Sequence, residues 1–230
     1  MIIKGIQKTS MVDFPGYLCA TLFTPGCNLR CPFCHNAGLV LGDGTDSRIE
    51  EADLLDFLRG RKGRLDGVCI TGGEPLLQSG VLEFVRKIKE IGYLVKLDTN
   101  GCFPEKLKEL LDAGVLDYVA MDIKNSPELY GKTVGIESFD LAPIYRSIEL
   151  LKSGKTSYEF RTTVSKTFHT EASLRAAGEM IRGAENWYLQ AFKNSGNLID
   201  NDVVGYDEIE LQNLCKVLEG YAKHLYLRGV

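Results

Sequence analysis

The 230-residue sequence lacks any apolar run long enough to cross a membrane, any long basic run, and any internal repeat or low-complexity tract. The apolar stretch at its start is too short for a signal peptide. Lys and Arg number 27 against 31 Asp and Glu, so the formal net charge is −4 and nucleic acid is not expected as the main partner. With 44% hydrophobic and 25% charged residues, we expect a globular, cytoplasmic protein.

Cysteine is the residue type whose number and spacing indicate most about this protein. The chain has seven cysteines, an odd number, and no export signal, which does not indicate a disulfide framework. Three of them, Cys27, Cys31 and Cys34, lie within eight residues. The other four are scattered, and we expect them to be small buried hydrophobic residues: Cys19, Cys69, Cys102 and Cys215.

The chain alternates short β-rich runs with amphipathic helical patterns. Strands are predicted at 17–23, 67–71, 93–98, 117–123, 157–164 and 186–191. Helices are predicted at 48–60, 78–91, 104–113, 141–153, 171–182 and 206–220, the first behind a capping box of Ser47 and Glu50. Six β-then-α units predict an α/β fold with parallel strands, either an open sheet or a partial barrel. We expect a single domain over 1–230, with its core at about 17–193 and a C-terminal helix and short extension at 206–230.

The cysteine triplet has the spacing C-x3-C-x2-C and follows the first predicted strand. A structural zinc ion takes four ligands, and His35 directly adjoins Cys34, which makes it an awkward fourth ligand. A 4Fe–4S cluster also usually takes four cysteines, so three would leave one iron open. An open coordination position is what a catalytic metal site keeps for its substrate.

This spacing, with Phe33 before the last cysteine, resembles the signature of the radical S-adenosylmethionine (SAM) superfamily. The resemblance implies a partial (β/α)6 TIM-like barrel. It also implies one 4Fe–4S cluster, held by Cys27, Cys31 and Cys34, whose open iron binds SAM. Phe33, Cys34 and His35 would then lie beside the cofactor, and no catalytic residue would be needed beyond the cluster and cofactor site.

Polar motifs follow the next three predicted strands. Each could be a plain turn or a surface ion pair. Beside the triplet, however, Gly72-Gly73-Glu74-Pro75 is similar to the family motif that holds the methionine amino group of SAM. Asp98-Thr99-Asn100 and Asp122-Ile123-Lys124 are similar to segments of pyruvate formate-lyase activating enzyme that contact SAM and a monovalent cation beside it.

Two cations complete the candidate cofactor site. Arg161 lies in the fifth predicted strand, where an isolated charge needs a partner, either the cofactor or a neighbouring carboxylate. Lys193 follows the sixth strand, where the formate-lyase activase has a histidine. His169 and His224 have no ligand-spaced partners, and we expect ordinary surface or helix-end positions for them.

The ending His35-Asn36 and the upstream segment VDFPG are similar to glycyl-radical-enzyme activases, above all to anaerobic ribonucleoside-triphosphate reductase activating proteins. That resemblance implies an oxidoreductase that cleaves SAM and forms a glycyl radical on a partner enzyme, with flavodoxin or ferredoxin as electron donor. Three alternatives stay open. They are an activase of another glycyl radical enzyme such as pyruvate formate-lyase, a small-molecule enzyme resembling 7-carboxy-7-deazaguanine synthase, and a non-enzymatic iron–sulfur or zinc module.

Overall fold

The computed structural model describes residues 1–42, 48–194, 196, 198–200 and 202–229. Within these ranges eight strands follow one another in chain order in one sheet. They are β1 (Gly5–Ser10), β2 (Cys19–Thr24), β3 (Gly67–Gly72), β4 (Leu94–Thr99), β5 (Tyr118–Asp122), β6 (Ser157–Val164), β7 (Ala184–Ala191) and β8 (Ala222–Arg228). Strand β1 is antiparallel to β2, whereas β2, β3 and β4 are mutually parallel, as are β6, β7 and β8. The predicted α/β class is confirmed.

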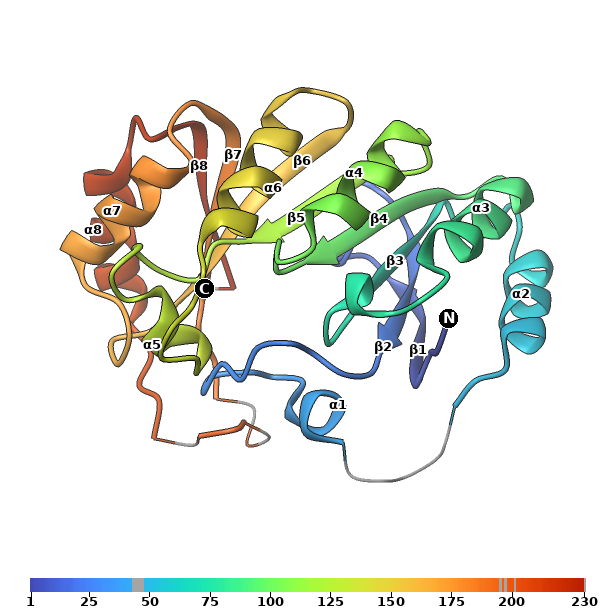
Figure 1. Ribbon diagram of the computed structural model, residues 1–230, viewed down its shortest axis with the longest axis horizontal. Coiled ribbons are helices and arrows are strands. Elements are labelled where there is room, and N and C mark those ends of the chain that lie inside the picture. Colours follow the sequence, from blue (N-terminus) through green and yellow to red (C-terminus); the bar gives the residue numbers. More distant parts are fainter. Residues whose placement is uncertain (43–47, 195, 197, 201, 230) are drawn as a thin grey trace. The chain divides into compact units, whose positions relative to one another are not determined.

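Helices occupy the connections between the parallel strands (Figure 1). They are α1 (Ala37–Leu41), α2 (Glu51–Gly60), the 3₁₀ helix η1 (Pro75–Leu77), α3 (Val81–Ile91), α4 (Pro104–Asp112), α5 (Tyr130–Val134), α6 (Ala142–Lys152), α7 (Glu171–Met180) and α8 (Glu208–Leu218). In the described ranges, none of these helices has the length and apolar character that a membrane crossing would require.

All six predicted strands and six predicted helices are present, with ends that differ by three residues or fewer. The helix predicted from residue 48 begins at Glu51, because Ile49 pairs with Ile3 in an isolated β-bridge. The helix is preceded by Glu50, which makes no side-chain capping bond, and Ser47 lies outside the described residues. The prediction missed β1 and β8, and the expected C-terminal extension is a strand that pairs in parallel with β7.

The chain forms two compact units. The N-terminal unit comprises Met1–Asn28, Gly38–Ala120 and Gly154–Ser157, and the C-terminal unit comprises Leu29–Ala37, Met121–Ser153 and Tyr158–Val230. Whether the whole chain behaves as one domain stays a prediction.

In the N-terminal unit, helix α3 shows why the amphipathic pattern folds as it does. Val81, Phe84, Val85 and Ile88 recur at helical spacing and are all buried, and Gly92 ends the helix in the left-handed conformation with φ of 93°. Helix α3 lies beside α2 (Figure 1), which buries Leu54, Leu55 and Leu58.

In the C-terminal unit, β6, β7 and β8 are tied by side chains as well as by backbone. Trp187 of β7 is fully buried and donates from Nε1 to Thr162 Oγ1 of β6 at 3.0 Å. From the end of β8, Arg228 reaches the buried Glu159 of β6 in a two-point ion pair of 3.0 and 3.2 Å. Its guanidinium carbon lies 4.0 Å from the ring centroid of Tyr188. These contacts anchor the strand that the sequence pattern did not show.

Candidate cofactor site

The cysteine loop leaves the carboxyl end of β2. Cys27 is partly exposed and belongs to the N-terminal unit, whereas Cys31 (8% exposed) and the partly exposed Cys34 belong to the C-terminal unit. The Cys34 N–H donates to the Cys31 carbonyl at 3.0 Å, which closes a tight turn between these two thiols. None of the seven cysteines is in a disulfide.

The glycine pair after β3 is packed against the chain just ahead of Cys27. The Gly73 N–H donates to Thr24 O, and the Glu74 N–H donates to Gly26 O, both at 2.8 Å. A Cβ atom at Gly73 would lie 1.9 Å from the Gly26 carbonyl oxygen, closer than any side chain can approach. Gly72 has φ of 116°. Glycine is therefore required here because two backbone segments approach each other closely, and not only because the chain turns.

Glu74 is fully buried and ties two strand ends together. Its carboxylate accepts from the Leu76 N–H at 3.0 Å, from the Thr99 hydroxyl at 2.8 Å and from the Asn100 N–H at 2.7 Å. A buried carboxylate needs several such donors to stay ionised. Glu74 thus positions the loop after β4, and a bond to the methionine amino group of SAM stays a prediction.

Asn100 connects that loop to the cysteine segment. Its side-chain amide nitrogen lies 2.9 Å from Asn28 Oδ1 and 3.7 Å from Cys27 Sγ, and its oxygen accepts from the Cys102 N–H at 2.9 Å. An amide N–H directed at a sulfur favours the thiolate, which is the form of cysteine that binds metals. Sequence reasoning proposed Asn100 but missed Asn28, which no motif marks.

The third polar motif, Asp122-Ile123-Lys124, lies in the C-terminal unit. The Asp122 carboxylate pairs with Lys124 Nζ and with Arg161 Nε, both at 2.9 Å. Arg161 thus has the neighbouring carboxylate that was one of its two predicted partners, and its contact with the cofactor stays a prediction. The buried Ile123 donates its N–H to Arg161 O at 2.8 Å. Burial alone would lower the pKa of Lys124, but Asp122 and then Cys31 and Tyr130 outweigh it, and the pKa is raised. The lasting positive charge near Cys31 favours its thiolate.

Aromatic rings surround the second half of the cysteine loop. Phe33 is buried, with its ring centroid 5.5 Å from that of Phe168. His35 is exposed and its ring centroid lies 5.6 Å from that of Phe192. Partial burial of the ring, and then the charge of Lys124, lower the pKa of His35. Lys193 is exposed two residues beyond β7, and its predicted contact with the cofactor stays a prediction.

His169 was expected at an ordinary surface or helix-end position. The expected surface position is wrong, because His169 is buried and only 1% exposed. Its Nδ1 accepts from the Ser165 N–H at 3.2 Å, so Nε2 carries the proton and donates to the Lys124 carbonyl at 2.8 Å. His169 therefore holds the backbone of Lys124. The contact with Lys124 gave no local sequence signal, because that residue lies 45 positions away along the chain.

The burial of His169 predicts a pH effect on stability. Burial lowers the pKa of its imidazole, so below about pH 6.5 the unfolded chain takes up a proton that the native protein does not. This contribution to the free energy of unfolding is present above that pH and is lost progressively as the pH falls below it. Urea unfolding of His169→Gln should show a flatter pH dependence than the wild type. His224→Gln, at an exposed site in β8, should keep the wild-type slope; equal slopes for both variants would contradict the assignment.

The cysteines at the other positions divide into two pairs. Cys19 and Cys69 are fully buried, as predicted, whereas Cys102 and Cys215 are partly exposed. In the described part of the chain, no three or more Cys, His, Asp or Glu side chains are already arranged to hold a metal ion. The residues that point to an iron–sulfur cluster here are the three cysteines. Three thiols lie on one short loop, two of them beside groups that favour thiolates.

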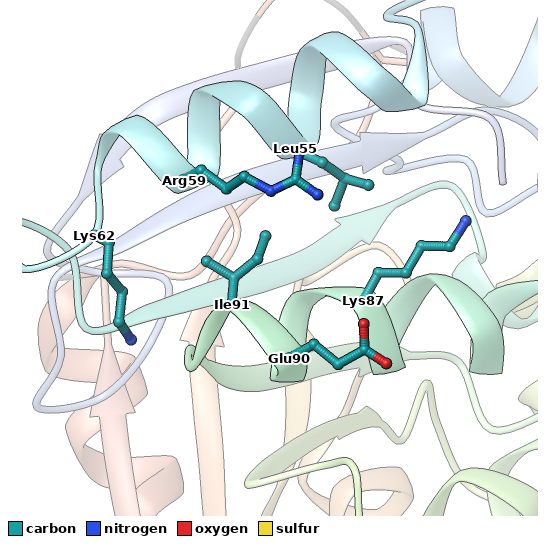
Figure 2. A pocket seen from close by; sticks show the side chains of 6 residues that line it. All are labelled: Leu55, Arg59, Lys62, Lys87, Glu90 and Ile91. Carbon is teal, nitrogen blue, oxygen red and sulfur yellow. The ribbon is translucent and has the colours of Figure 1, made fainter.

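A pocket of about 610 Å³ lies between α2 and α3 (Figure 2). It is lined by Leu55, Arg59, Lys62, Lys87, Glu90 and Ile91. One of its cations joins the two helices, since Lys87 of α3 pairs with Glu51 of α2 at 2.5 Å, whereas Arg59 pairs with Asp56 within α2 at 2.7 Å. The pocket is separate from the candidate site.

Three comparisons with known proteins bear on these features. The profile of the radical SAM superfamily matches residues 21–165. A Methanocaldococcus jannaschii protein, named among glycyl-radical enzyme activating enzymes, is 31% identical over 238 residues that cover all of this chain and 96% of its own. The pyruvate formate-lyase-activating enzyme of Listeria monocytogenes is 33% identical over 142 residues, 56% of each chain.

Two solved structures share the fold. SuiB of Streptococcus suis bound to S-adenosylmethionine has a TM-score of 0.64 at 17% identity, over 91% of this chain and 52% of its own. A domain of pyruvate-formate lyase-activating enzyme from Bacteroides vulgatus has a TM-score of 0.55 at 17% identity, over 69% of this chain and 98% of its own. This chain thus spans about half of SuiB and of the Listeria protein. The predicted partial-barrel fold is confirmed.

Proposed function

Since the chain belongs to the radical SAM superfamily, we propose that it activates a glycyl radical enzyme and that Cys27, Cys31 and Cys34 hold its 4Fe–4S cluster. Members of the superfamily use such a cluster together with SAM. When bound, the cluster supplies the electron that breaks the C5′–S bond of SAM and yields a 5′-deoxyadenosyl radical. That radical would take a hydrogen atom from a glycine Cα of the partner enzyme.

One observation carries the cofactor half of the proposal. Gly73 and Glu74 are bonded to the backbone that leads into Cys27, and Glu74 fixes Asn100, which contacts the Cys27 sulfur. The loops after β2, β3 and β4 thus form one rigid framework around the first cluster ligand. A cofactor bound at the cluster would meet backbone at Gly72 and Gly73 and polar side chains at Asp98 and Thr99.

The C-terminal unit supplies the second set of proposed contacts. Asp122 is held by two cations and can accept hydrogen bonds from ribose hydroxyls, while Lys124 and Arg161 offer positive charge for the carboxylate of SAM. Phe33, His35, Ile123 and Pro75 would pack around the cofactor, and Lys193 would reach it from beyond β7. The residues of the chain would bind and orient the cofactor and exclude water from it.

The glycyl-radical half rests on the full-length similarity to the M. jannaschii protein. We propose anaerobic ribonucleotide reductase as the partner, on the His35-Asn36 ending and the VDFPG segment. Pyruvate formate-lyase is the second candidate, because the Listeria activase is 33% identical over half its length. A flavodoxin or ferredoxin would supply the electron.

The proposal is tested by anaerobic reconstitution, reduction and incubation with SAM. We expect 5′-deoxyadenosine and methionine in equal amounts. Addition of anaerobic ribonucleotide reductase, but not of pyruvate formate-lyase, should then produce a glycyl radical doublet in the paramagnetic resonance spectrum. Absence of 5′-deoxyadenosine would favour a binding module, and 5′-deoxyadenosine without a radical on any glycyl radical enzyme would favour a small-molecule substrate.

A further inference from the structure

A lysine is buried inside the N-terminal unit, next to the proposed cofactor residues. Lys96 of β4 has a side chain that is 2% exposed. It pairs in register with Cys69 of β3, which pairs with Thr21 of β2, so the three side chains form a row across one face of the sheet. Asp98, two residues further along β4, shares this face.

The Lys96 ammonium contacts two groups on this face of the sheet. It forms an ion pair with Asp98 Oδ1 and lies 3.7 Å from Cys69 Sγ. Burial, and then the charge of Asp98, raise the pKa of Cys69, so its thiol is neutral and does not balance the ammonium. Asp13, the other carboxylate that acts on this row, accepts from the Thr21 hydroxyl at 2.6 Å. Asp98 is thus an ionised group in direct contact with Lys96.

The monovalent cation expected from the resemblance does not fit at this carboxylate. Of the two Asp98 oxygens, Oδ1 faces the Lys96 ammonium and Oδ2 accepts from the Thr71 hydroxyl at 3.1 Å. A cation bound to Asp98 would stand beside a fixed positive charge in a poorly hydrated site, where like charges repel strongly. We propose that Lys96 takes the place of this cation, so that SAM binding depends on the lysine and not on a dissolved ion.

This inference rests on the proposed function and makes Lys96 a positioning residue. Its ammonium would keep the Asp98 carboxylate ionised and oriented for the cofactor, and the Thr71 hydroxyl would fix the second oxygen. Removal of the lysine would leave a partly buried carboxylate without this partner, and a small cation could then occupy the space.

The first test uses the unmodified protein with its cluster reconstituted. SAM affinity is measured by equilibrium dialysis at constant ionic strength in the chlorides of potassium, sodium, ammonium and tetramethylammonium, the last being too large for a cation site. We expect affinities that agree within about twofold. A saturable gain of about tenfold in potassium or sodium would overturn the proposal.

The second test removes the lysine. Lys96→Met should weaken SAM binding about tenfold in tetramethylammonium chloride, and ammonium or potassium should restore most of it. In Lys96→Met/Asp98→Asn the cations should restore nothing. Lys108→Met is the matched control, because Lys108 is an exposed lysine that pairs with Asp112. The affinity of this variant for SAM should equal that of the wild type.

Wild-type affinity in Lys96→Met, or a loss that no cation restores, would overturn the proposal. If Lys96→Met does not fold, the salt series on the unmodified protein decides whether the proposal holds. A protein that neither binds nor cleaves SAM in any of the salts would refute the proposed function, and this inference with it.

Discussion

The Cys31→Ala variant is expected to lose the iron–sulfur cluster. The wild-type chain should hold about four irons after anaerobic reconstitution, and the variant fewer than one, because two thiolates cannot hold a cluster that already has only three. Cys31 is also the thiol that contributes to the raised pKa of Lys124, so its loss removes a negative group from that site. Iron analysis, the visible absorption spectrum and 5′-deoxyadenosine formation measure the effect.

Cys215→Ala is the matched control for this variant. Cys215 is a partly exposed cysteine of α8, and burial raises the pKa of its thiol, as expected of a cysteine without a metal. The control should keep its iron and its activity. A Cys31→Ala protein with a full complement of iron and normal SAM cleavage would show that the ligand assignment is wrong.

The second large effect is expected at Gly73. A methyl group there would meet the Gly26 carbonyl at 1.9 Å, so Gly73→Ala must displace the backbone that leads into Cys27. We expect SAM cleavage to fall roughly a hundredfold, which corresponds to about 2.7 kcal/mol, in line with the strain of overpacking. Because the displaced segment carries a cluster ligand, iron content should fall as well, and not cofactor binding alone.

Gly38→Ala provides the comparison for Gly73→Ala. A Cβ at Gly38 in α1 would meet nothing within 4 Å, and its backbone is not in the left-handed region. This variant should keep its iron content and its rate of 5′-deoxyadenosine formation. Full activity in Gly73→Ala would mean that the close packing against Gly26 is not needed for function.

The sequence predicted the layout of the fold because its signals are local. Helix α3 has its apolar stripe and closing glycine within a dozen residues, and the cysteine spacing lies within eight. Strand β1, GIQKTS, is mostly exposed or half-buried and polar, and β8 has only one buried residue, Ala222, so neither shows a buried-strand pattern. Their pairing with β2 and β7 cannot be seen in a short window.

The same limit applies to the site. The sequence alone was enough to propose Cys27, Gly73 and Asp98, because each belongs to a short motif of recognisable residue types. Lys96 and His169 act through contacts with residues 27 and 45 positions away along the chain, Cys69 and Lys124. Such partners are brought together by the sheet, and no spacing rule connects them.

We propose that this protein removes a hydrogen atom from a glycine of a partner enzyme. The most direct measurement uses anaerobic ribonucleotide reductase prepared with glycine deuterated at Cα and follows the label by mass spectrometry after incubation with reduced protein and SAM. We expect deuterium in the 5′-deoxyadenosine, together with a glycyl radical on the reductase. Unlabelled 5′-deoxyadenosine with every deuterated glycyl radical enzyme supplied would contradict it.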